Sequence, residues 1–375
     1  TTLLIDSARR AIAESNAQFV IFPELTLTSY PPEDLLLRPS LAPRMKVAMD
    51  RILAAKLPTT LVFGYPESYE GKLYNSLAIV DQGKLLATYR KQCLPNYQVF
   101  DERRYFQAGN QPCVLEIHGL RLGFTICEDL WEEMPTQQFE HQSLDLLLNI
   151  NASPFHRGKA CERRQLLKRR AQAIGAPIAY VNLVGGQDEL VFDGGSLAVD
   201  SVGNAVVQAP QFEAGLYPAV FKLSSSGRYE PARVSCATQP SDLAQVYKAL
   251  TIGVRDYVTK NGFKGVVLGL SGGIDSALTL AIAVDALGAH AVHAVMMPFE
   301  YTSQLSRDAA AEQAATLGVA YRSISIKSIY DQFVGALASE FEGLAEDVTE
   351  QNLQARCRGV LLMAISNKKG YLVLT

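Results

Sequence analysis

Gly265-Val266-Val267-Leu268-Gly269-Leu270-Ser271-Gly272-Gly273-Ile274-Asp275-Ser276 is an apolar run that enters a glycine loop. The pattern predicts a buried strand over 265–270 and, after the loop, a helix over 276–287. Glycines before a helix let free backbone amides approach an anion, and the helix dipole favours negative charge there. The loop has no lysine of the G-x-x-x-x-G-K-[ST] pattern, and Asp275 would attract a cation instead. The stretch therefore predicts a phosphate site at which Mg²⁺ joins Asp275 to the phosphates.

The alternative interpretation of this loop is a simple turn and helix cap, since Asp and Ser are both good caps. The apolar strand before it and the alanine-rich helix after it favour the phosphate site. Strands over 289–297 and 320–325, with a helix over 306–317, extend the unit into a doubly wound parallel α/β domain. The chain stops within an expected strand, so we expect this domain to be incomplete at the C-terminus, with part of its site beyond Thr375.

The first half of the chain alternates helical stretches with short apolar strands that end in polar turns, as α/β layered folds do. Glu24 follows a strand over 18–22, and Cys127 follows a strand over 121–126. Lys91 follows an expected hairpin that turns at Gln82-Gly83. Covalent hydrolysis of an amide needs a thiolate, a base and a donor to the oxyanion, and these three residues supply those groups. Taken singly, each has an ordinary alternative: a packed thiol, a helix cap and a solvated lysine.

The motifs Phe22-Pro23-Glu24, Tyr89-Arg90-Lys91 and Ile126-Cys127-Glu128-Asp129-Leu130-Trp131, in this order, resemble the nitrilase superfamily. The resemblance implies a four-layer α-β-β-α sandwich with Glu24 as general base, Cys127 as nucleophile and Lys91 as stabiliser of the tetrahedral intermediate. Segments 30–35 and 94–102 resemble the glutaminase branch of that superfamily that is attached to NAD synthetases. The glutamine-binding residues that this implies are Tyr97, Glu128, Ser153 and Lys159, with Arg157 as a neighbouring alternative to Lys159.

The form Ser-Gly-Gly-x-Asp-Ser resembles the ATP-pyrophosphatase family, which has an adenine nucleotide alpha hydrolase-like fold and cleaves ATP to AMP and pyrophosphate. The implied ATP-binding residues are Gly269, Leu270, Ser271, Gly272, Gly273, Ile274, Asp275 and Ser276. Segments 297–303 and 349–356 resemble NAD synthetases, which implies that Asn352 and Arg356 contact deamido-NAD. Without the resemblance, the second segment is typical of an ordinary helix surface.

Together the two halves imply a ligase that makes NAD from glutamine, ATP and deamido-NAD and releases glutamate, AMP and pyrophosphate. An amidase that releases ammonia and a domain that activates a carboxylate are chemically complementary, whereas either fold alone assigns no reaction. The family also implies a homo-oligomer through paired synthetase domains. Two alternatives remain: an amidase fused to a ligase for another carboxylate, and a nucleotide-responsive regulatory protein with an inactive glutaminase.

The bulk properties of the 375-residue chain agree with two domains, since one hydrophobic core seldom supports this length. We expect a first domain over 1–222, a linker rich in Ser, Pro and Arg over 223–242, and a second domain over 243–375. With 35 basic and 38 acidic residues, the net charge of −3 argues against nucleic acid or a membrane as partner and favours small molecules.

The six cysteines form no C-x-x-C pair, so neither a zinc site nor a disulfide framework is expected, and the chain has the pattern of a cytoplasmic protein with reduced thiols. No apolar run approaches the roughly 20 residues that span a bilayer. The first residues do not resemble a signal peptide. Because the chain lacks an initiator methionine, we expect a missing N-terminal segment.

Overall fold

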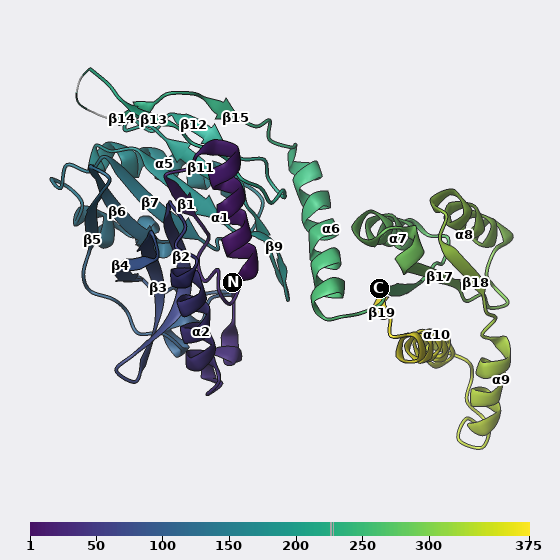
Figure 1. Cartoon of the computed structure of the whole chain (residues 1–375). Helices are drawn as coiled ribbons and strands as arrows, with labels where there is room; N and C mark the ends of the chain where they lie inside the picture. The colour runs from purple at the N-terminus through teal and green to yellow at the C-terminus, as the bar shows by residue number, and fades with distance from the viewer. Residues whose placement is uncertain (226, 228) are drawn as a thin grey trace. The chain divides into compact units, whose positions relative to one another are not determined.

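The computed structural model describes residues 1–225, 227 and 229–375 (Figure 1). These residues form two compact units, Thr1–Val246 and Tyr247–Thr375. Among the described residues, no helix is both long enough and apolar enough to cross a membrane.

The first unit contains two large sheets. One has the strand order β1-β2-β3-β4 and the other the order β15-β12-β11-β8-β7-β6-β5. The strands of the first sheet are β1 (Phe19–Ile21), β2 (Thr60–Tyr69), β3 (Lys72–Asp81) and β4 (Lys84–Arg90). Those of the second are β5 (Cys113–Ile117), β6 (Leu120–Ile126), β7 (Leu146–Asn151), β8 (Ile178–Asn182), β11 (Leu197–Val199), β12 (Ala205–Gln208) and β15 (Ser235–Cys236).

Helices cover the outer face of each sheet. Side chains of α1 (Thr2–Ser15) and α2 (Leu41–Ala54) pack against Leu61 and Phe63 of β2. The intervening residue Val62 points the other way and packs against strands of the second sheet, because successive strand side chains alternate between faces. On the second sheet's outer face lie α3 (Glu128–Trp131), α4 (Glu133–Gln137) and α5 (Lys159–Ile174). This layering is the predicted α-β-β-α sandwich.

The hairpin that leads to Lys91 is confirmed, with Asp81 of β3 opposite Lys84 of β4. A second hairpin, β9 (Val184–Gln187) with β10 (Leu190–Asp193), was not predicted. Two short strands, β13 (Phe221–Leu223) and β14 (Tyr229–Pro231), form a further pair. Both β14 and β15 lie within the expected linker, and β13 ends at its first residue. The strand β15 pairs with β12 at the edge of the second sheet. These strands are short and their outward residues are exposed, so they leave no alternating pattern in the sequence.

The second unit has one parallel sheet in the order β18-β17-β16-β19, which confirms the predicted doubly wound domain. Its strands are β16 (Val266–Gly269), β17 (Val292–Met296), β18 (Ala320–Ser323) and β19 (Leu372–Leu374). On one face pack α6 (Asp242–Lys260), α7 (Ile274–Leu287) and α8 (Gln304–Leu317). On the other face pack α9 (Lys327–Ala336) and α10 (Val348–Lys369).

The short helices include three 3₁₀ turns: η1 (Glu33–Leu37), η2 (Glu102–Arg104) and η3 (Ala289–Ala291). The turn η3 occupies the start of the strand predicted over 289–297, and β17 begins only at Val292. Gly288, with φ +79°, ends α7 immediately before this turn. The apolar run therefore includes both a connection and a strand, which its composition alone does not separate.

Candidate active sites

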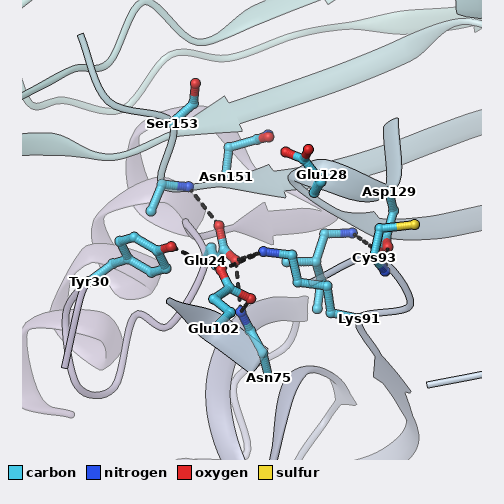
Figure 2. A network of polar contacts seen from close by, with 12 residues as sticks. Glu24, Tyr30, Asn75, Lys91, Cys93, Glu102, Glu128, Asp129, Asn151 and Ser153 are labelled. Atoms are coloured by element: carbon cyan, nitrogen blue, oxygen red, sulfur yellow. Dashed lines mark hydrogen bonds and ion pairs between the residues drawn. The ribbon is translucent and has the colours of Figure 1, made fainter. Parts of the chain in front are cut away.

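The three residues predicted for amide hydrolysis lie at the ends of strands from both sheets of the first unit. Glu24 follows β1, Lys91 follows β4 and Cys127 follows β6, and all three are buried. Lys91 Nζ donates to Glu24 Oε1 at 2.7 Å. The other oxygen, Glu24 Oε2, accepts from the backbone amide of Ala152 at 3.0 Å, directly after β7 (Figure 2). The structure therefore holds the carboxylate of Glu24 in one orientation.

A second glutamate, Glu102 in η2, shares the ammonium of Lys91 (Figure 2). Lys91 Nζ donates to Glu102 Oε1 at 2.7 Å, and the Tyr30 hydroxyl donates to the same oxygen at 2.9 Å. Asn75 Nδ2 lies 2.7 Å from Glu24 Oε1 and 3.4 Å from Glu102 Oε2. Sequence reasoning missed Glu102 as a site residue. It falls in the segment 94–102 that resembles the family, but no pattern in that segment distinguishes a buried glutamate from a surface one.

Burial raises the pKa of Glu102 to about 7, although the neighbouring ammonium of Lys91 opposes the rise. For Lys91, burial acts to lower the pKa, but the charges of Glu102 and Glu24 outweigh it and hold the pKa well above its ordinary value. Lys91 therefore stays protonated and can donate to a developing oxyanion.

Cys127 occupies a sharp turn between β6 and α3. Its backbone has φ +45° and ψ −100°, a conformation that residues with a Cβ rarely adopt. The amide of Cys127 donates to the Ile150 carbonyl at 2.9 Å, which helps to hold this turn. Backbone strain of this kind is often found at functional sites. The turn places the thiol where β6 ends, beside the residues that follow β1 and β4.

Burial raises the pKa of the Cys127 thiol well above its ordinary value, and the charge of Glu24 raises it further. The ammonium of Lys91 acts in the opposite direction. In the resting site the sulfur therefore carries its proton. A nucleophilic thiolate then requires proton transfer to a nearby base, and the carboxylate of Glu24 is such a base.

Of the predicted glutamine-binding residues, Tyr97 and Glu128 are brought together: the Tyr97 hydroxyl donates to Glu128 Oε1 at 2.9 Å. Glu128 immediately follows Cys127, and burial raises the pKa of its carboxyl group. Lys159 begins α5, and its Nζ lies 3.8 Å from the centre of the Trp131 ring and 3.4 Å from Glu162 Oε2. The alternative cation, Arg157, is exposed in the preceding turn.

Ser153 is buried and is held by an ion pair that sequence reasoning did not find. Arg163 donates to the Ser153 carbonyl at 2.8 Å and to its hydroxyl at 3.2 Å. The guanidinium also donates to both carboxylate oxygens of Asp193, at 2.7 and 2.9 Å. Arg163 and Asp193 are both buried. This pair therefore fixes the turn that carries Ser153.

The predicted nucleotide loop of the second unit runs from the end of β16 into the first turn of α7. Gly269 ends β16, Leu270 is buried behind it, and Gly273 caps the helix. Gly272 has φ +83°, and a Cβ at this position would overlap the Ser306 carbonyl oxygen. The loop thus requires glycine for both its backbone angle and its close approach to α8.

Two serines brace this loop. The Ser271 hydroxyl accepts from the Gly273 amide at 3.2 Å and lies 3.1 Å from the Ser276 hydroxyl. Ser276 also donates to the Gly273 carbonyl at 2.9 Å. Ile274 and Asp275 form the exposed first turn of α7, where backbone amides have no partner within the helix. This arrangement is suited to an anion.

Asp275 is the one predicted metal ligand. Within the described part of the chain, no three His, Cys, Asp or Glu side chains gather closely enough to hold a metal ion. A lone exposed carboxylate fits Mg²⁺ that arrives with a nucleotide, because Mg²⁺ commonly binds through one or two carboxylates together with substrate phosphates.

The predicted deamido-NAD contacts, Asn352 and Arg356, lie on the exposed side of α10. Arg356 donates to the Asn352 carbonyl at 3.2 Å, one turn away. Among the described residues, no hydrogen bond joins either side chain to the loop 271–276. The structure therefore places them one turn apart on the exposed side of α10.

Comparison with known families agrees with these two sites. Residues 2–230 match the carbon-nitrogen hydrolase family and residues 246–375 match the NAD synthase family. In the first unit, an amidase of Nesterenkonia has a related structure, with 28% identity and a TM-score of 0.52 over 58% of this chain and 81% of the amidase. The chain thus combines a carbon-nitrogen hydrolase with an NAD synthase.

Relatives that match both parts are glutamine-dependent NAD(+) synthetases. The protein of Xylella fastidiosa is 47% identical over 99% of this chain and 68% of its own length. The solved structure of the Acinetobacter baumannii synthetase in complex with ADP is 46% identical, with a TM-score of 0.94 over 99% of this chain and 70% of that one. The chain belongs to the glutamine-dependent NAD(+) synthetase family.

Proposed function

We propose that this protein hydrolyses glutamine at Cys127 and uses the ammonia, with ATP, to convert deamido-NAD⁺ to NAD⁺, releasing glutamate, AMP and pyrophosphate. Family membership and the two sites support this function. The observation that carries it is the buried pair of Glu24 and Lys91 at the turn that bears Cys127, because a base, a cation and a thiol are the groups that amide hydrolysis by thioester formation requires.

In the first site, the Cys127 proton passes to Glu24 as the sulfur attacks the side-chain amide carbon of glutamine. The carbonyl oxygen becomes an oxyanion that accepts a hydrogen bond from Lys91. The carbon–nitrogen bond then breaks, and Glu24 returns the proton to the leaving nitrogen, which departs as ammonia. Water, deprotonated by Glu24, hydrolyses the glutamyl thioester and restores the thiol.

Glutamine is recognised through its α-substituents. The carboxylate of Glu128, held by the Tyr97 hydroxyl, binds the α-ammonium group. Lys159 binds the α-carboxylate, and the Trp131 ring holds its ammonium near the site. Ser153 contributes polar contacts from the turn after β7, where Arg163 fixes its position.

In the second site, the residues from Gly269 to Ser276 bind ATP, with the amides of the α7 N-terminus directed at its phosphates. Asp275 would hold Mg²⁺, which neutralises phosphate charge when bound. Asn352 and Arg356 on α10 bind deamido-NAD⁺, whose carboxylate is activated by adenylation before ammonia attacks.

The Cys127→Ala variant tests the two-site proposal. Synthesis driven by glutamine should fall by at least about 1,000-fold, because the nucleophile is lost. Synthesis driven by added ammonium should remain close to that of the unmodified protein. Cys161→Ala is the matched control, because Cys161 is an exposed thiol, and it should support both reactions. Equal loss of both activities in Cys127→Ala would exclude separate sites for ammonia release and ammonia use.

Two wider features complete the proposal. The protein forms a homo-oligomer through its synthetase domains; in support, α10 exposes the apolar side chains of Val348, Val360 and Met363. Light scattering that gave a monomer mass would contradict this. The protein acts in the cytoplasm, a location with which the six free cysteines of the described residues are compatible. Fractionation that placed it outside the cytoplasm would contradict this.

A further inference from the structure

Asp129 lies two residues after the nucleophile and is completely buried. Its carboxylate accepts four hydrogen bonds. Oδ1 accepts from the backbone amides of Gln92 at 3.0 Å and Cys93 at 2.8 Å. Oδ2 accepts from the backbone amide of Ile126 at 3.0 Å and from the Tyr89 hydroxyl at 2.8 Å.

The four donors lie on either side of two site residues. Tyr89, Gln92 and Cys93 surround Lys91, and Ile126 directly precedes Cys127. Lys91 follows β4 of the four-stranded sheet, whereas Cys127 follows β6 of the seven-stranded sheet. Asp129 therefore joins the two sheets at the place where the cation and the thiol meet. Figure 2 shows its contact with the backbone of Cys93, beside Lys91.

We propose that Asp129 is a positioning residue that fixes Lys91 relative to Cys127 across the two sheets. The inference rests on the proposed role of Cys127 as nucleophile. Hydrogen bonds to an ionised carboxylate are roughly twice as strong as bonds between neutral groups, so four of them hold the strand ends firmly. A displacement of about 1 Å at a reacting centre can lower a rate by about 100-fold.

Asp200 provides a matched comparison within the same unit. Its carboxylate also accepts backbone amides, from Val202 at 3.0 Å and Asn204 at 2.8 Å. These bonds close the turn between β11 and β12, which carries none of the site residues. Asp200→Asn therefore removes a carboxylate that binds amides without touching the connection between Lys91 and Cys127.

Asp129→Asn tests the proposal at nearly constant side-chain volume. Asparagine keeps one acceptor oxygen, but its NH₂ group faces the donors that the other carboxylate oxygen had bound. One of the two pairs of hydrogen bonds is therefore lost. We expect kcat for glutamine hydrolysis to fall about 100-fold, with KM changed by less than about threefold, since positioning acts on the reacting atoms rather than on substrate binding. The rate at which iodoacetamide alkylates Cys127, resolved by mass spectrometry, should fall about tenfold because thiolate formation also depends on the alignment.

The Asp200→Asn control should match the unmodified protein in both measurements. A folded Asp129→Asn variant with normal kcat and normal alkylation would overturn the proposal, as would equal losses in the two variants. If Asp129→Asn does not fold, Tyr89→Phe takes its place, because it removes a single hydrogen-bond donor and keeps the carboxylate of Asp129. This variant should lower both the hydrolysis rate and the alkylation rate by at least about threefold. Unchanged rates would overturn the proposal. Absence of glutamine hydrolysis in the unmodified protein would count against the proposed function, while the alkylation rates would still decide the role of Asp129.

Discussion

Replacing Glu102 with glutamine should remove a pH dependence from the stability of the first unit. Burial raises the pKa of Glu102 from its ordinary value of 4.5 to about 7, against the lowering effect of Lys91. Between pH 4.5 and about pH 7, Glu102 keeps its proton in the folded protein but has released it in the unfolded chain. The contribution to stability is therefore fully present below pH 4.5 and is lost as the pH rises through about 7. The difference between 4.5 and about 7, at about 1.36 kcal/mol per pH unit, corresponds to about 3 kcal/mol.

The single tryptophan of the chain, Trp131, provides the assay, because it lies in the first unit. Its fluorescence follows urea unfolding of that unit separately from the second. Between about pH 5 and pH 8 the unmodified protein should lose about 2–3 kcal/mol more stability than Glu102→Gln. Any constant cost of the glutamine side chain cancels in this difference, because it is the same at each pH. Glu116→Gln, at an exposed position of β5, is the control and should follow the unmodified protein. Parallel pH profiles for Glu102→Gln and the unmodified protein would refute the assignment of this titration to Glu102.

Two further substitutions test other parts of the molecule. Arg163→Met should destabilise the first unit by about 3–5 kcal/mol, because it leaves the buried Asp193 carboxylate without its ion pair; a loss below about 1 kcal/mol in urea unfolding would contradict this. Gly272→Ala should weaken ATP binding at least about tenfold, since the position has φ +83° and an added methyl group overlaps the α8 backbone. Calorimetric titration with ATP measures this beside Gly335→Ala, whose added methyl group meets open space; equal affinities would show that the loop tolerates the change.

The positions of the predicted triad follow from the sequence because Glu24 and Cys127 come after short apolar runs and Lys91 comes after a predicted hairpin. Such a run predicts a buried strand, and the residue after it must lie at a sheet edge. Glu24 and Cys127 satisfy this condition, whereas Lys91 was placed by the hairpin that precedes it. The glycine loop was predictable for a similar reason, since a continuous apolar run precedes it and an alanine-rich helical segment follows it.

The supporting residues could not be found in this way. Glu102 lies in a short 3₁₀ turn and Asp193 in a hairpin of four-residue strands, and neither segment has a pattern that indicates burial. Both are charged residues, which are usually exposed unless they have a partner. Their partners, Lys91 and Arg163, lie 11 and 30 residues away in the sequence. Burial at these positions is decided by tertiary pairing, on which local composition carries no information.

The ion pairs of Lys91 with both Glu24 and Glu102 bear on the proton transfer from Cys127. When Glu24 accepts the proton of Cys127, its carboxyl group becomes neutral and no longer balances the buried ammonium of Lys91. A buried charge without a partner costs several kcal/mol, roughly 3–5 when one member of a pair is removed. Because Lys91 Nζ also donates to Glu102 at 2.7 Å, an anionic partner remains available throughout the transfer above about pH 7, where Glu102 is ionised. We therefore expect Glu102→Gln to slow formation of the thioester as well as to change the pH dependence of stability. A variant with the altered stability profile but an unchanged acylation rate would separate these two roles.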